Sequence, residues 1–496
     1  MPTLARDATR QRAASDILIQ VVARVVNLGL GVIVTALLVR ALGNTGYGQW
    51  STLLVVIGLL GYFATFGMEE AAIREAAREP EQEFEWLGAV IALRLTLLAP
   101  LVLVSALAVV LLHQNQQMLI AGLVLVCAMP FGGVGTLGIL FRLRVDNRIP
   151  MIEMTVRSLL WGAAVLVVYL EHGTMIELAL ALVVTGLLSS SLQAVAALRL
   201  IGRWPRPSRA RLPALLRVGV PLGISGMLTI SYGRIDQVLV FTLAGAKQAG
   251  LYAAVYTILE RAHFVPQSIL TTLNPVIAAS WPRDRERMLR AARQTAELLA
   301  IASFGALAFT IVAAEPVVRL IFGASFTEAA AALPVLAGAF VLISYGYLND
   351  VLLATIGLVR KRMTIGLTAL VVNVAGNLAL IPLFGFIAAA WMTFGTEALV
   401  IALAATKVRR TLGLGFPALG RIGRTAAAAV LLGCALGTLR LAGAGLPVLI
   451  AGACVLYPAL LFALRALDVA DVRLVLRRSR PPERAARPAV EGVREA

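Results

Sequence analysis

Apolar stretches of about 20 residues recur along nearly the whole chain, and a helix of that length crosses the hydrocarbon core of a bilayer. The chain has 496 residues, of which 59% are hydrophobic and only 14% are charged. Its mean hydropathy is +0.86. A soluble protein of this size is excluded by these values, and the sequence predicts an all-α polytopic membrane protein.

A helix-length window along the sequence predicts about fourteen transmembrane spans. They cover approximately residues 17–40, 50–67, 88–112, 118–141, 149–170, 174–198, 218–243, 250–280, 294–314, 329–353, 363–383, 385–406, 424–441 and 446–467. The loops between them are short. We therefore expect no folded domain outside the membrane.

The loop arginines predict the orientation of the chain, because cytoplasmic loops of membrane proteins collect Lys and Arg. Arginines gather in both tails and in every second loop, whereas the opposite loops hold few basic residues, among them Lys247, Arg319 and Arg440. Both termini are therefore expected in the cytoplasm. This distribution also explains the net charge of +17 as an insertion signal with attraction to anionic lipid head groups, so nucleic acid is not an expected partner.

The predicted spans divide the chain into six segments. These are a cytoplasmic N-terminal segment at 1–16, an N-lobe of six spans at 17–198, a cytoplasmic inter-lobe linker at 199–217, a C-lobe of six spans at 218–410, two further spans at 411–467, and a basic, disordered cytoplasmic tail at 468–496.

The two lobes are expected to be pseudo-symmetric. LLVRALGNTGYGQW after the first span aligns with LVFTLAGAKQAGLY after the seventh, so Gly43 and Gly48 have the spacing of Gly245 and Gly250. Internal repeats of this kind are typical of secondary transporters.

Motifs for nucleotide binding and for metal binding are missing from the sequence. It contains no GxxxxGK[ST], and no GxGxxG between a strand and a helix. Cys127, Cys434 and Cys454 lie in apolar runs without CxxC or Cys/His spacing. We expect no catalytic residue, no metal and no cofactor, and we interpret the chain as a membrane transporter rather than an enzyme.

Three stretches resemble polysaccharide transporters of the Wzx type, in the multidrug/oligosaccharidyl-lipid/polysaccharide exporter superfamily. RALGNTGYGQWSTLLVVIGLL with FGMEEAAIREAA is similar to the N-terminal signature of that family. VPLGISGMLTISYGRIDQVLVF and the run up to LNPVIAAS resemble its seventh and eighth spans, and FGASFTEAAAALPVL with LVRKRM resembles a later loop and span. Together these stretches cover most of residues 15–410.

The resemblance implies a flippase with two lobes and alternating access. Its substrates would be isoprenoid-linked sugars, usually undecaprenyl-diphosphate oligosaccharides such as O-antigen or exopolysaccharide units, carried across a bacterial cytoplasmic membrane. Polymerase and glycosyltransferases of the same pathway would be partners. The resemblance does not specify the glycan, the oligomeric state or the coupling ion, H⁺ or Na⁺ if there is one.

Three other functions compete with this interpretation. A drug or organic-cation antiporter of the same fold would favour unpaired carboxylates in the N-lobe, where the first span offers Arg24 instead. A lipid II flippase stays within the favoured class. A membrane glycosyltransferase or polymerase would be expected to carry larger external loops with acidic or His residues.

Ionisable side chains within the predicted spans are the candidate substrate-binding residues, because such groups are costly in a bilayer and usually pair or face water. They are Arg24, Arg94, Arg234, Asp236, Glu260, Arg261, His263, Asp350 and Glu397. The arginines suit a diphosphate, since guanidinium presents fixed donors to phosphate oxygens. For Arg24 and Arg94, snorkelling to the interface is the competing interpretation.

Arg234 and Asp236 are two residues apart, so on a helix they would point about 200° from each other. They therefore need partners elsewhere, and we expect Glu260, Arg261 and His263 of the eighth span to meet them near the bilayer midplane. One hypothesis is a charge network that leaves one arginine for the ligand. The other is a fully satisfied structural cluster.

Several pairs and small residues are predicted to be structural. Glu153 and Arg157 are four apart in the favourable order for a helical ion pair. Asn373, Asn377 and Glu397 are expected to form hydrogen bonds between helices. Asp350 is interpreted either as a ligand for a sugar, a proton or a sodium ion, or as a tie between helices. In a separate pattern, Gly219 and Gly223 form a GxxxG motif that predicts close packing.

Overall fold

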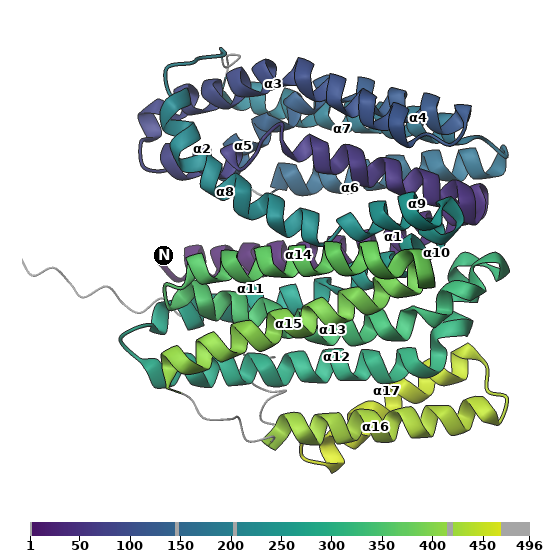
Figure 1. Ribbon diagram of the computed structural model, residues 1–496. Coiled ribbons are helices and arrows are strands. Elements are labelled where there is room, and N and C mark those ends of the chain that lie inside the picture. The colour runs from purple at the N-terminus through teal and green to yellow at the C-terminus, as the bar shows by residue number, and fades with distance from the viewer. Residues whose placement is uncertain (1, 144–147, 202–205, 414–419, 468–496) are drawn as a thin grey trace, which may run out of the picture.

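The computed structural model describes residues 2–143, 148–201, 206–413 and 420–467, with the backbone alone for residues 2–26 and a few others. Every element in these ranges is a helix (Figure 1). The α-helices are α1 (Pro2–Tyr62), α2 (Met68–Ala76), α3 (Glu83–Leu112), α4 (Gln116–Cys127), α5 (Gly138–Leu143), α6 (Arg148–Leu170), α7 (Met175–Ile201), α8 (Leu212–Tyr232), α9 (Ile235–Ala244), α10 (Ala246–Ala262), α11 (Phe264–Ser280), α12 (Arg285–Phe322), α13 (Leu333–Thr355), α14 (Val359–Phe384), α15 (Phe386–Leu412), α16 (Gly420–Leu441) and α17 (Leu446–Ala463). Three short 3₁₀ helices are η1 (Pro80–Gln82), η2 (Met129–Leu137) and η3 (Ala324–Ala331).

The outer surface of the helices is apolar. Within the described ranges, 11 helices are long and apolar enough to cross a membrane. Large aliphatic side chains such as Leu103, Leu111, Leu383 and Val430 are exposed on them, as expected for a surface that faces lipid rather than water. The prediction of an all-helical, multi-pass membrane protein is confirmed.

Some predicted spans differ from single helices. The first two are the two parts of α1, which are helices separated by the non-helical backbone of the turn at Gly43. The seventh is divided into α8 and α9, and the eighth into α10 and α11. The predicted N-terminal segment is helical where the structure describes it, and the tail at 468–496 lies outside the described residues.

Two bundles of helices lie one above the other in Figure 1. The first bundle contains α2 to α7 and the second contains α10 to α15. Two helices join the bundles: α1 packs against both α6 and α10, and α8 packs against both α2 and α14. The α16–α17 hairpin packs against α12 at the outer edge of the second bundle.

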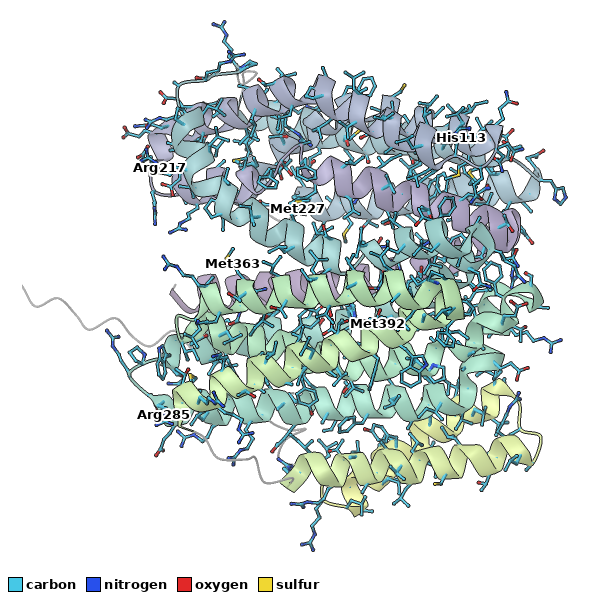
Figure 2. All side chains as sticks on the ribbon, viewed as in Figure 1. His113, Arg217, Met227, Arg285, Met363 and Met392 are labelled. Atoms are coloured by element: carbon cyan, nitrogen blue, oxygen red, sulfur yellow. The ribbon has the colours of Figure 1, made fainter. Side chains whose placement is uncertain are left out.

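The helices turn at two opposite ends. One end has turns at Gly43, Gly245, Gly323 and Gly385, all with positive φ, and we name it the glycine-turn end. The opposite end carries Arg217 and Arg285, both labelled in Figure 2, with most of the loop arginines, and we name it the arginine-rich end.

The turns at Gly43 and Gly245 have the same backbone conformation. Gly43 has φ 65° and ψ −178°, and Gly245 has φ 89° and ψ 170°. Only glycine adopts such a combination readily. The alignment of the two stretches in the sequence is therefore confirmed in the backbone.

The helices after these two turns touch each other without intervening side chains. A Cβ atom added to Gly48 would strike the carbonyl oxygen of Ala246, and one added to Gly250 would strike that of Asn44. The two contacts are reciprocal, as a local two-fold relation requires. They bring α1 and α10 into backbone contact at the glycine-turn end.

A second glycine face lies on α8. Gly219 packs against Met68, and Gly223 packs against the backbone of Phe66. The prediction that this GxxxG motif serves close packing is confirmed. It holds α8 against the corner where α1 leads into α2, toward the arginine-rich end.

Candidate functional site

The helix that contains Arg234 is broken beside this residue. The α8 helix ends at Tyr232 and α9 begins at Ile235. The Tyr256 hydroxyl donates a hydrogen bond of 2.8 Å to the carbonyl oxygen of Gly233, which the break has freed. Irregular backbone at membrane depth is tolerated where protein buries it or where it lines a cavity. The predicted 200° separation of Arg234 and Asp236 assumes one continuous helix, whereas Arg234 lies at the break, just before the first residue of α9. The two residues have separate partners, as predicted.

A cavity of about 550 Å³ lies beside this break, between α1, α6, α7, α8, α9 and α10. It extends from Tyr47, near the glycine-turn end, to Asn27 and Leu59, nearer to the arginine-rich end. Four of the predicted site residues line it, namely Arg234, Asp236, Glu260 and Arg261. Its wall also carries Trp50, Ser158, Trp161, Tyr256 and Thr257. We call it the central cavity.

Arg234 and Glu260 form an ion pair across the central cavity wall. Their side chains approach to 2.5 Å and are 44% and 29% exposed. This pairing of the seventh and eighth predicted spans is confirmed. Since both partners are partly solvated, the pair is a modest contribution to stability.

Arg261 also lines the central cavity, but it has no ion-pair partner among the described residues. Within the described residues, its guanidinium makes no ion pair and no hydrogen bond. It lies in the last turn of α10, where a positive charge is favourable. The guanidinium lies over Gly31 of α1 and is exposed to the cavity.

Asp236 is held by neutral groups rather than by the predicted charges. The Tyr252 and Thr393 hydroxyls donate to its Oδ2, and the backbone N–H of Gln237 donates to Oδ1 at 2.8 Å. The carboxyl group is only 2% exposed. It lies in the first turn of α9, where the helix dipole favours a negative charge.

A second cavity of about 230 Å³ lies within α8 to α10 and α13 to α15, and it holds three more of the predicted residues, His263, Asp350 and Glu397. Asp350 pairs with Arg362 at 3.0 Å. The His263 ring stacks on Phe340 with centroids 6.0 Å apart, so the prediction that His263 joins the Arg234 cluster is wrong. Asp236 borders both cavities.

Arg94 lies apart from the residues that line these two cavities. It pairs with Glu69 of α2 at 3.6 Å and donates a hydrogen bond to Thr136. Burial raises the pKa of the Glu69 carboxyl above its ordinary value, and the charge of Arg94 opposes that shift. The side chain of Arg24 lies outside the described residues.

The predicted Glu153–Arg157 pair and the predicted hydrogen bond of Asn373 between helices are confirmed, whereas Asn377 bonds within its own helix. Glu153 and Arg157 approach to 3.6 Å. Asn373 of α14 donates a hydrogen bond to Thr396 of α15 at 3.3 Å, and Asn377 donates to Asn373 at 2.9 Å. These contacts join turns of one helix or two neighbouring helices.

Sequence reasoning missed the aromatic groups of the site. Trp50 and Trp161 stack with centroids 6.3 Å apart, at the wall of the central cavity. Tyr252 and Tyr256 are one helical turn apart and support Asp236 and Gly233, respectively. That spacing, next to Glu260 in an apolar run, is the signal that would have predicted a polar face on α10.

Known proteins relate this site to a family. Residues 13–281, more than half of the chain, match the family described as "Polysaccharide biosynthesis protein". The chain belongs to this family. The resemblance to polysaccharide transporters is confirmed, whereas no curated protein sequence matches the chain.

Solved structures with a similar fold include a lipid II flippase and two transporters of the MOP superfamily. A lipid II flippase, MurJ, in an inward closed conformation has a TM-score of 0.72 at 12% identity, covering 93% of this chain and 100% of its own. An inward-facing multidrug resistance MATE transporter has a TM-score of 0.64 at 15% identity, covering 79% of this chain and 99% of its own. A MOP superfamily transporter from Pyrococcus furiosus has a TM-score of 0.56 at 15% identity, covering 79% and 94%.

Proposed function

We propose that this protein is a flippase for an undecaprenyl-diphosphate-linked oligosaccharide, a unit of a surface polysaccharide such as O-antigen or exopolysaccharide, in a bacterial cytoplasmic membrane. Membership of the polysaccharide biosynthesis protein family supports the pathway, and the fold supports transport. Polymerase and glycosyltransferases of the pathway would be its partners. The observation that carries the substrate class is the guanidinium of Arg261, which lies in the central cavity without an ion-pair partner among the described residues.

A diphosphate is the ligand that this guanidinium suits. Its planar donors match phosphate oxygens, and charge-assisted hydrogen bonds are about twice as strong as neutral ones. Arg234 is already paired with Glu260, so Arg261 is the cation available to a ligand among the described cavity residues. Trp161 and Tyr256 also line the central cavity, and aromatic rings of this kind suit sugar rings.

Alternating access follows from the position of the cavity between the bundles. We propose that the N-lobe at 17–198 rocks against the C-lobe at 218–410, with fourteen spans in all and both termini in the cytoplasm. In the conformation described, the Gly48 and Gly250 contacts support closure at the glycine-turn end, which we place outside. The glycan would enter from the arginine-rich, cytoplasmic end while the isoprenoid chain stays in lipid.

The antiporter alternative has less support. An organic cation needs an available carboxylate, but of the carboxylates that line the central cavity Glu260 is paired and Asp236 is buried among hydroxyl and N–H donors. A lipid II flippase is the second candidate, because the likeness to MurJ covers 93% of this chain and therefore extends beyond the 79% shared with the MATE transporter.

The test is a complementation assay in the bacterium that carries the gene. After deletion of the gene, cells receive the wild-type chain, the Arg261→Gln variant or the Arg290→Gln variant. Arg290 is a matched control, since it is an arginine of α12 that pairs only with Glu286 one turn away. Lipid-linked glycans are then measured in each leaflet, together with the surface polysaccharide.

We expect the deletion strain to accumulate a diphosphate-linked glycan in the cytoplasmic leaflet and to lose the polymer. Arg261→Gln should restore transport at least about tenfold less well than the wild type, as expected for a lost charged hydrogen bond, and Arg290→Gln should restore it fully. Accumulation of lipid II instead would support the second candidate. Unchanged glycolipids with new sensitivity to cationic drugs would support the antiporter.

The Arg234–Glu260 pair has its own predicted outcome. Arg234→Asp or Glu260→Arg alone places like charges side by side, and we expect each to lower the midpoint of thermal unfolding. The double variant should recover most of that loss, because the pair is restored in reverse. Recovery of both stability and transport would identify the pair as structural. Recovery of stability without recovery of transport would show that transport requires the positive charge at position 234 rather than at position 260.

A further inference from the structure

Gly31 of α1 lies directly against the guanidinium of Arg261. A Cβ atom added to Gly31 would lie 2.7 Å from Nη1, 2.8 Å from Cζ and 3.0 Å from Nη2, closer than real side chains approach. The planar group therefore rests on bare helix backbone. We propose that Gly31 is a positioning residue that places the guanidinium of Arg261 for a diphosphate ligand, an inference that rests on the proposed function.

No hydrogen bond or ion pair among the described residues fixes the position of this guanidinium. Within the described residues, Arg261 makes no hydrogen bond or ion pair that would direct its long side chain. Contact with the flat backbone at Gly31 restricts the rotamers that the side chain can adopt. A group that is ordered before binding loses less entropy when the ligand arrives.

The contact also connects ligand binding to the arrangement of helices. Gly31 and Arg261 belong to α1 and α10, which are far apart in the sequence and packed together in the structure. Any motion that separates α1 from α10 removes this support from the guanidinium. The anion site is therefore complete only while these two helices are together.

The Gly31→Ala substitution tests the contact between Gly31 and the guanidinium of Arg261. The atoms that a new methyl group would strike are the far end of a flexible side chain, so the guanidinium moves and the helix packing does not. Alanine is also favourable within a helix. Gly29 provides a matched control, because it lies in the same helix and a Cβ atom there meets nothing within 4 Å.

The first measurement is the binding of geranylgeranyl diphosphate to the purified full-length chain. We expect Gly31→Ala to raise the Kd about tenfold, which corresponds to a largely lost charged hydrogen bond, and Gly29→Ala to leave it unchanged. In the Arg261→Lys background, Gly31→Ala should change the Kd less than about twofold, because lysine has no planar group to displace and the two effects are coupled.

The second measurement needs no ligand. Phenylglyoxal modifies exposed guanidinium groups, and the rate at Arg261 is followed by peptide mass spectrometry. We expect faster modification in Gly31→Ala than in the wild type or in Gly29→Ala. Equal rates and equal Kd values for all three proteins would overturn the inference. If no protein binds the diphosphate but Gly31→Ala alone speeds modification, the positioning role stands and the proposed function fails.

Discussion

Replacing Gly48 or Gly250 by valine is expected to abolish transport while the chain still folds. A Cβ atom at either position meets a backbone oxygen of the opposite helix, which cannot swing away as a side chain would. Overpacking of this kind costs about 1–3 kcal/mol. A conformation in which α1 and α10 part at the glycine-turn end avoids that cost, so the equilibrium shifts toward it by roughly 5- to 150-fold.

The shift is measurable as accessibility of the central cavity. After Cys127, Cys434 and Cys454 are replaced by serine, a single cysteine is introduced at Ser158, which lines the cavity. A membrane-impermeant maleimide added on the external side should label it in the valine variants and only weakly in the parent.

The control for these variants is Gly58→Ala. Gly58 lies in the same helix and lines the same cavity, but a Cβ atom there meets nothing within 4 Å. It should transport and label like the parent. Normal transport by Gly48→Val or Gly250→Val would contradict closure by these contacts and would place the moving contact elsewhere.

Features that depend on distance along a helix could be predicted from the sequence. The apolar runs are long enough to span a bilayer, so the helical fold follows from their length. Arg234 and Glu260 were paired correctly because both lie at similar depth from the turn at Gly245, and depth follows from the rise per residue. Glu153 and Arg157 meet for the same reason, one turn apart.

Features that depend on the rotation and interruption of helices could not be predicted. The break at Gly233 leaves Asp236 facing Tyr252 and Thr393 instead of the charged residues of α10. His263 stacks on Phe340 of α13 and lines the second cavity instead of meeting Arg234. Depth alone does not give the side of the helix on which a residue lies, and that side is set by packing between helices far apart in the sequence.

Asp236→Ala is expected to give the largest loss of stability of any substitution in the two cavities. The carboxyl group is 2% exposed and accepts hydrogen bonds from Tyr252, from Thr393 and from a backbone N–H. Each buried donor left without an acceptor costs about 1–3 kcal/mol. This cost falls on the Tyr252 hydroxyl and the Gln237 N–H, because the Thr393 hydroxyl also has the carbonyl oxygen of Ala389 as an acceptor at 2.9 Å. We therefore expect the midpoint of thermal unfolding in detergent to fall by many degrees.

Asp350→Ala is the matched control, because both aspartates border the second cavity but Asp350 is 39% exposed. Its partner Arg362 is 40% exposed and remains solvated, so little stability should be lost. An equal fall for Asp236→Ala and Asp350→Ala would mean that burial does not decide the loss of stability.

Asp236→Asn separates the charge of the carboxylate from its structural role, because the amide retains a carbonyl acceptor for Tyr252. A variant that folds without transporting would show that the charge itself is used during transport.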